Sequence, residues 1–99
     1  MEHKAEDHPH PGSVLLKELE EIGLSQGTLA RYIGAKADDI TTLCAGTAPM
    51  TPVLAWKISR ALGGSPRKWL ELQLNYDLVR VNASEYENIA ELGGGADDD

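Results

Sequence analysis

The chain has one cysteine, no phenylalanine and no long apolar run. The single thiol of Cys44 cannot form an internal disulfide, which suits a reducing compartment. Apolar runs such as Val14–Leu16 are far shorter than the ~20 residues that a membrane-spanning helix needs. Residues Met1–His10 contain no apolar run that could serve as a secretory signal. We therefore expect a cytoplasmic protein.

Residue sets for catalysis or metal binding are also scarce. The three histidines, His3, His8 and His10, lie in the first ten residues, where no cysteine or acidic cluster completes a metal site. The rest of the chain has no histidine, and its acids fall mainly on predicted solvent faces. We expect no enzyme activity, no cofactor and no bound metal, and we interpret the histidines as incidental to a flexible leader.

Charge is distributed unevenly along the chain, whose formal net charge is −7. Residues 1–24 hold two lysines against six acids, and residues 63–99 hold three basic residues against eight acids. Between them, residues 25–62 hold four basic residues against two acids. Phosphate binding depends on the local patch more than on the total, so this middle segment is the candidate for contact with DNA. The long-range field of the whole chain still repels DNA.

Apolar spacing and capping signals predict five helices and no β-strand. The first is opened by residues 11–13 and ends at Ile22, and the other expected ranges are 26–33, 37–45, 52–62 and 66–81. The expected N-caps are Ser13, Ser25, Thr51 and Ser65, and the expected stops are Gly23, Gly34, Gly46 and Gly63. In the second and third helices, Leu29, Ile33, Ile40 and Leu43 should face inward. Two short helices joined by a glycine turn form a helix-turn-helix.

The ends of the chain differ from this helical body. The Ser84-x-x-Glu87 pattern resembles a capping box and predicts a short C-terminal helix within residues 83–92. We expect a flexible leader over residues 1–10, a helix-turn-helix domain over residues 11–82, and a disordered acidic tail over residues 93–99.

Two motifs go beyond generic helices. The pattern Ser25-Gln26-x-x-Leu29-Ala30, followed by Gly34, Ile40 and Gly46, matches the Cro/repressor-type helix-turn-helix. The stretch from Ser65 to Leu78, SPRKWLELQLNYDL, closely resembles the C-terminal signature of HigA/VapI-type plasmid-maintenance antidote proteins. The same family pattern includes His10-Pro11-Gly12 before Leu15-Leu16, and Thr51-Pro52.

The resemblance implies an all-α fold: a five-helix Cro/repressor-like (XRE family) helix-turn-helix domain with a short C-terminal helical extension. Members of the family typically form homodimers, neutralise a HigB-type mRNA-cleaving toxin and repress their own operon. The implied function is therefore that of a HigA-type antitoxin and transcriptional regulator, and its partners are the toxin, double-stranded operator DNA and a second copy. The alternative is a protein-interaction module of the same fold that has lost or weakened DNA binding.

The expected DNA-binding residues come from the positions that repressors of this type direct at DNA. They are Gln26, Arg31, Lys36, Ala37, Asp38, Asp39, Thr41, Thr42 and Thr47. Gln26 matches a position that holds a phosphate, and Lys36 and Arg31 add positive charge. The position matching Ala45 is often Asn, and the loop at Thr47 often holds Lys or Arg, so this chain departs from the pattern.

Asp38 and Asp39 have two interpretations. In the first turn of a helix, each acid stabilises the exposed amides by roughly 0.3–1 kcal/mol. At a DNA-facing position, the same charges repel phosphate, although an Asp can accept a hydrogen bond from cytosine N4. The structural role is the one that we favour.

An apolar stripe late in the fifth predicted helix suggests how two copies associate. Its residues are Leu74, Leu78, Val79 and Val81, which we expect to be buried in an isologous dimer. Large aromatic side chains at helical spacing, Trp56, Trp69 and Tyr76, are expected to pack in the core or the dimer. Cys44 is expected to be a small core residue. Gln73, Asn75 and Asp77 either bond helix ends or line an interface, and the sequence leaves both open.

Overall fold

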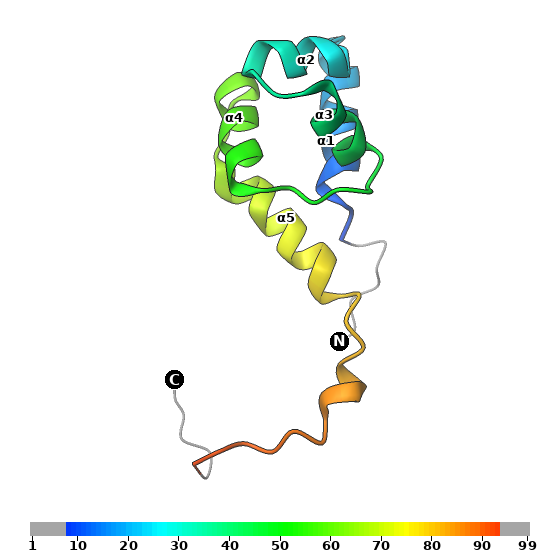
Figure 1. The fold of residues 1–99 in the computed structure, drawn as a ribbon, viewed down its shortest axis with the longest axis vertical. Helices are drawn as coiled ribbons and strands as arrows, with labels where there is room; N and C mark the ends of the chain where they lie inside the picture. The colour runs from blue at the N-terminus through cyan, green and yellow to red at the C-terminus, as the bar shows by residue number, and fades with distance from the viewer. Residues whose placement is uncertain (1–7, 94–99) are drawn as a thin grey trace.

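The computed structural model describes residues 8–93 and contains five α-helices in that range. They are α1 (Pro11–Ile22), α2 (Gln26–Ile33), α3 (Ala37–Cys44), α4 (Pro52–Leu62) and α5 (Pro66–Leu78). Figure 1 shows α1 to α4 gathered into one body and α5 running down from it. The predicted all-α fold is confirmed, although α5 ends three residues earlier than expected. In the described part of the chain, no helix is both long and apolar enough to cross a membrane.

Short-range capping sets most of the helix boundaries. Three N-cap hydroxyls, on Ser25, Thr51 and Ser65, each accept a hydrogen bond from the amide three residues further on. Pro52 and Pro66 follow two of these caps at the first helical position, where a missing N–H costs no hydrogen bond. Gly23 and Gly34 end α1 and α2 in the left-handed region, at φ values of 72° and 71°.

The start of α1 differs from the prediction. Its cap is His10 rather than Ser13, because His10 Nδ1 accepts a 2.9 Å hydrogen bond from the Gly12 amide. Ser13 lies inside the helix and donates its hydroxyl to the His10 carbonyl at 2.8 Å. The His10 ring also packs edge-on against Tyr76 of α5, with centroids 4.8 Å apart. His10 therefore belongs to the folded domain, and the part of the predicted leader before residue 8 lies outside the described residues.

The core lies where all five helices meet. Trp69 of α5 is its largest fully buried side chain, and leucine, isoleucine and alanine side chains from α1 to α4 pack around it. Cys44 is buried, as predicted, and burial raises the pKa of its thiol. Not every large apolar side chain of these helices is buried. Ile22 and Trp56 are mostly exposed, and Trp56 exposes 58% of its surface. Trp56 therefore does not pack in the core of the single copy, and its expected packing in a dimer stays a prediction.

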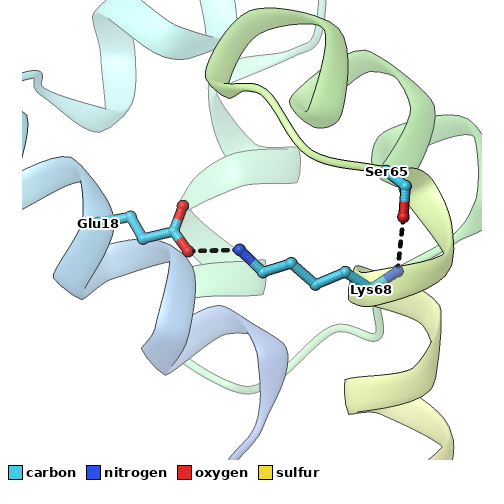
Figure 2. Close-up of polar contacts among 3 residues, drawn as sticks. All are labelled: Glu18, Ser65 and Lys68. Carbon is cyan, nitrogen blue, oxygen red and sulfur yellow. Dashed lines mark hydrogen bonds and ion pairs between the residues drawn. The ribbon is translucent and has the colours of Figure 1, made fainter.

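Helix α1 is tied to α3 and α5 by contacts of different kinds. At Gly12, a Cβ would lie 1.7 Å from the Leu43 carbonyl oxygen, so only glycine permits this approach of α1 to α3. On the surface, Lys68 Nζ donates to Glu18 Oε2 at 2.7 Å, while the Lys68 amide bonds to the Ser65 cap (Figure 2). Exposed ion pairs of this kind contribute about 0.2–1 kcal/mol, so apolar packing dominates the contact.

Gln73 holds the loop between α3 and α4. Its Oε1 accepts a 2.7 Å hydrogen bond from the buried Met50 amide, and its Nε2 donates to Asp77 Oδ1 at 2.9 Å. The sequence left two roles open for these residues, bonding within the fold or lining an interface. Gln73 and Asp77 bond within the fold. Asn75 lies exposed on the same helix.

Replacing Gln73 tests this loop contact. Gln73→Ala removes the acceptor of a buried amide, and we expect the free energy of unfolding to fall by about 2 kcal/mol. Urea denaturation followed by circular dichroism measures the change. The matched substitution Asn75→Ala, at an exposed position two residues away, should change stability by no more than about 0.5 kcal/mol. Equal effects at both positions would show that the Gln73 bond does not hold the loop.

The segment after α5 is less helical than predicted. Only Ala83–Tyr86 forms a helix, the 3₁₀ turn η2, and its cap is Asn82 rather than Ser84. Asn82 Oδ1 accepts from both the amide and the hydroxyl of Ser84. Residues 87–93 form no helix, and every residue from 81 to 93 is exposed. The prediction of a helix reaching residue 92 is wrong, and all but the first residue of the predicted tail lie outside the described range.

Protonation of His10 should weaken the start of α1. Burial lowers the pKa of His10 below its ordinary value of 6.5 and Arg80 lowers it further, while the Asp77 carboxylate opposes both. The unfolded chain therefore takes up the proton first as pH falls. The stability supplied by the neutral His10 cap is complete above pH 6.5 and is lost as pH falls through the lowered pKa.

The size of this effect follows from the cap. We expect acidification to lower the free energy of unfolding by up to about 1 kcal/mol through His10. His10→Asn keeps a capping side chain that does not titrate, so its stability should vary less with pH across that window. Urea titrations between pH 7.5 and 5 compare the two chains. Parallel pH profiles for His10→Asn and the natural chain would contradict the assignment.

Candidate nucleic-acid interface

A short turn fixes α2 and α3 as a helix-turn-helix. Gly34 reverses the chain in the left-handed region, and the Ala35 amide then bonds back to the Ala30 carbonyl at 2.8 Å. Lys57, from α4, donates to the Gly34 carbonyl at 3.2 Å and holds the turn from outside. The apolar faces of α2 and α3 are buried, and the opposite face of α3 is left in solvent.

Positive charge collects at the N-terminus of α2. Ser25 accepts from the Thr28 amide, and Arg31 Nη2 donates to Thr28 Oγ1 at 3.3 Å. A Cβ at Gly27 would lie 3.8 Å from Arg31 Nη1, which places the guanidinium back along the helix beside its first turn. Gln26 is half-buried at the first helical position. The first amides of a helix have no intrahelical acceptor, so this end presents donors and a guanidinium to an anion.

The exposed face of α3 carries short polar side chains. Ala37, Asp38, Thr41 and Thr42 are all exposed on it, as predicted. The hydroxyls of Thr41 and Thr42 donate to the Asp38 main-chain carbonyl at 3.3 and 2.6 Å, so they are committed to the helix in this conformation. Thr47, in the following loop, is exposed and donates to the Thr42 carbonyl at 3.2 Å. This face therefore offers few free groups that read bases.

The two acids of the first turn of α3 have different surroundings. Asp39 lines a surface depression of about 410 Å³ between α3 and α4, together with Lys36 and Lys57. Asp38 lies outside that depression, one turn from Thr42. Asp39 therefore lines a depression that Lys36 and Lys57 also line, while Asp38 lies on the face that carries Thr41 and Thr42. The sequence analysis treated the two acids alike.

Lys57 is the functional candidate that the sequence analysis missed. It lies on α4, far from the helix-turn-helix in sequence, and no local motif marks it. Only the packing of α4 against α2 brings its ammonium group to the turn. With Arg31 and Lys36, it gives the region three cations against the two carboxylates of α3.

The predicted dimer stripe is exposed at three of its four positions. Leu74, Leu78 and Val81 each expose more than half of their surface, whereas Val79 is half-buried at the C-cap of α5. Within residues 8–93, no group of three or more His, Cys, Asp or Glu side chains could hold a metal ion.

These features define a class. A five-helix domain with a capped α2, a glycine turn and an exposed α3 is a Cro/repressor-type helix-turn-helix protein. No protein-family model matches the chain. Among curated proteins, it is 35% identical over 78 residues to the uncharacterized HTH-type transcriptional regulator YddM of Escherichia coli, covering 79% of this chain and 83% of that protein. It is 33% identical over 70 residues to virulence-associated protein I of Dichelobacter nodosus, covering 70% of this chain and 65% of that one.

Solved structures agree with these relatives. A putative antidote protein of a plasmid maintenance system from Nostoc punctiforme superposes with a TM-score of 0.72 at 30% identity, covering 85% of this chain and 96% of that one. Antitoxin HigA of Pseudomonas aeruginosa, solved with the higBA promoter, gives a TM-score of 0.79 at 26% identity, with 86% and 97% coverage. The chain belongs to the HigA/VapI family of helix-turn-helix antidote proteins.

Proposed function

We propose that the chain is a cytoplasmic antitoxin that neutralises a HigB-type toxin and represses its own operon as a dimer on operator DNA. The observation that carries this proposal is the match, over 86% of the chain, to an antitoxin that was solved with its promoter. The geometry of the helix-turn-helix supports it, because α3 is exposed along one face and α2 presents its N-terminus beside Arg31. The protein acts by binding and carries out no catalysis.

Each half of the helix-turn-helix has a distinct part in the proposed DNA contact. The first amides of α2, with Gln26 and the Arg31 guanidinium, bind a backbone phosphate. Helix α3 enters the major groove with Ala37, Asp38 and Thr42 towards the bases. Fluorescence anisotropy with the chain's own promoter and a scrambled duplex tests this part. Equal affinity for both duplexes would remove the regulator function and leave only the protein-binding one.

The toxin is the second partner. A net charge of −7 favours association with a basic protein, because opposite charge speeds encounter. Co-expression with the adjacent reading frame should give a stable complex and relieve the growth arrest that this frame causes alone. A neighbouring product that neither arrests growth nor co-purifies would overturn the antitoxin proposal.

Assembly into a dimer is expected to depend on the stripe of Leu74, Leu78 and Val81. Light scattering after size exclusion at micromolar protein should report about twice the monomer mass, because an isologous contact buries the stripe of both copies. Leu78→Glu should shift the mass to that of a monomer. Val53→Glu, which adds the same charge to an exposed apolar residue on α4, serves as the control and should remain a dimer. A mass unaffected by Leu78→Glu would place the interface elsewhere.

The surface of α3 favours a second candidate function. Two carboxylates on its first turn, and threonine hydroxyls bound to the helix's own backbone, suit protein contact better than base reading. In this candidate, the chain binds the toxin as a module whose DNA binding is weak. Tight promoter binding by the natural chain would exclude it.

A further inference from the structure

The loop between α3 and α4, residues 45–51, begins as an extension of α3. The Thr42 carbonyl accepts hydrogen bonds from the amides of Thr47 and Ala48, at 3.0 and 3.2 Å. It also accepts the Thr47 hydroxyl at 3.2 Å. Thr42 and Thr47 are both exposed, so the first half of the loop continues the exposed face of α3 and is fixed to its C-terminal end.

The second half of the loop is bonded to α5. Met50 exposes only 4% of its surface, and its amide donates to Gln73 Oε1 at 2.7 Å. Figure 1 shows the loop crossing the lower side of the helical body, next to α5. A buried amide needs an acceptor, so this bond determines where the loop meets α5. Thr47 is therefore held between α3 on one side and α5 on the other.

Asp77 determines which end of the Gln73 side chain faces the loop. Gln73 Nε2 donates to Asp77 Oδ1 at 2.9 Å. An ionised carboxylate can only accept hydrogen bonds, so it favours the orientation with Nε2 towards Asp77 and Oε1 towards Met50. The opposite orientation would place two acceptors together at Asp77 and two donors together at Met50. Asp77 thus orients the Gln73 amide.

His10 borders the same loop from the start of α1. A Cβ at Gly46 would lie 3.9 Å from His10 Cγ, and His10 forms a hydrogen bond with the Ala48 main chain. The ring also packs on Tyr76, one residue from Asp77 in α5. The middle of the loop therefore lies against a side chain that is itself packed on the end of α5.

We propose that Gln73 is a positioning residue for DNA binding and that Asp77 orients it. Gln73 holds the α3–α4 loop in the place from which Thr47 and the C-terminal end of α3 meet the duplex. A loop that is already in place needs less ordering when it binds, and its contacts then contribute more to affinity. This inference rests on the proposed DNA contact and extends it to α5, an element outside the helix-turn-helix.

Fluorescence anisotropy with the chain's own promoter tests the role of Gln73. It is measured below the temperature at which any variant begins to unfold. Gln73→Ala should lower the affinity roughly three- to tenfold, about the value of one hydrogen bond. Ile58→Val, at a fully buried position in α4, also lowers stability and should leave the affinity unchanged. Equal losses in the two variants would show a general effect of stability and overturn the proposal.

An exchange of polarity tests the role of Asp77. Gln73→Glu keeps an acceptor for the Met50 amide but places a second carboxylate against Asp77. It should weaken promoter binding more than Asn75→Asp, which adds the same charge at an exposed site on α5. Adding Asp77→Asn to Gln73→Glu supplies a donor again and restores the natural net charge, so the affinity should recover. A double variant no better than Gln73→Glu would overturn the orienting role of Asp77.

Amide NMR spectra of the free protein separate this inference from the proposed DNA contact. Gln73→Ala should shift the resonances of Thr47, Ala48 and Met50, and Ile58→Val should leave them in place. Unshifted loop resonances would overturn the hold of Gln73 on the loop. Shifted resonances with unchanged promoter affinity would overturn the positioning role and leave the DNA contact standing. A natural chain with no preference for its promoter would overturn both.

Discussion

Gly12→Ala should destabilise the protein by about 3 kcal/mol or more, the largest loss that we expect from a single methyl group. The added Cβ would lie 1.7 Å from the Leu43 carbonyl oxygen and 2.6 Å from its carbon. Both atoms belong to the backbone of α3, so no rotation of a side chain relieves the overlap. Helices α1 and α3 must move apart, which opens the packing of Leu15 and Leu43 in the core.

Gly27→Ala provides the matched control. Gly27 lies in the first turn of α2, and a Cβ there meets only Arg31 Nη1, at 3.8 Å. Because alanine is the better helix former, Gly27→Ala should raise stability by up to about 1 kcal/mol. Urea unfolding of both variants, monitored by circular dichroism, measures the difference. If Gly12→Ala were as stable as the natural chain, α1 and α3 could not lie as close together at Gly12 as this structure places them.

Helix boundaries were predictable where a residue and its near neighbours determine them. Gly34 ends α2 because a left-handed residue closes the helix, and Thr51-Pro52 starts α4 through a cap and a preset φ. Each signal acts within about one helical turn, so it does not depend on how the rest of the chain packs. The Ser84-x-x-Glu87 pattern failed for the complementary reason: residues 87–93 have no packed surface to stabilise a helix, and short helices are marginal without one.

Contacts between distant residues were not predictable. The Gln73 amide meets the Met50 N–H only because α5 crosses beneath the α3–α4 loop, and periodicity does not specify that crossing. His10, and not Ser13, caps α1, and its ring packs against Tyr76, which is far away in the sequence. Trp56 has the spacing of a core residue, yet it borders a groove. A helical pattern tells which residues share a face, and only the packing tells what covers it.

The predicted DNA-binding residues show the same contrast between what local sequence determines and what packing determines. The motif placed all of them on α2, α3 or the loops beside α3, and there the structure finds them, largely exposed. Their surroundings depend on α4, because Lys57 of α4 lines the same depression as Asp39, and Asp38 lies outside it. Both acids lie in the first turn of α3, but only Asp39 lines the depression towards α4. The effects of replacing each acid on DNA binding can therefore be predicted separately.

Replacing both acids should strengthen binding to DNA. The double variant Asp38→Ser with Asp39→Arg changes the charge of the surface by three units. At about 1 kcal/mol per unit close to a phosphate in water, affinity for a scrambled duplex at low salt should rise on the order of ten- to hundredfold. One new arginine contact should steepen the slope of log affinity against log salt by about 0.9. Fluorescence anisotropy at several salt concentrations measures both quantities.

The single neutralisations separate the two acids. Asp38→Asn should improve affinity more than Asp39→Asn, because Asp38 lies on the face that we propose to meet DNA, whereas Asp39 lines the depression towards α4. Both keep the hydroxyl bonds of Thr41 and Thr42, which use the Asp38 main-chain carbonyl. Glu20→Gln, an equal charge change at an exposed site on α1, controls for net charge alone. If instead the natural chain bound its promoter tightly and Asp38→Asn abolished the preference over a scrambled duplex, Asp38 would be a base-reading residue, since its carboxylate is an acceptor suited to cytosine N4.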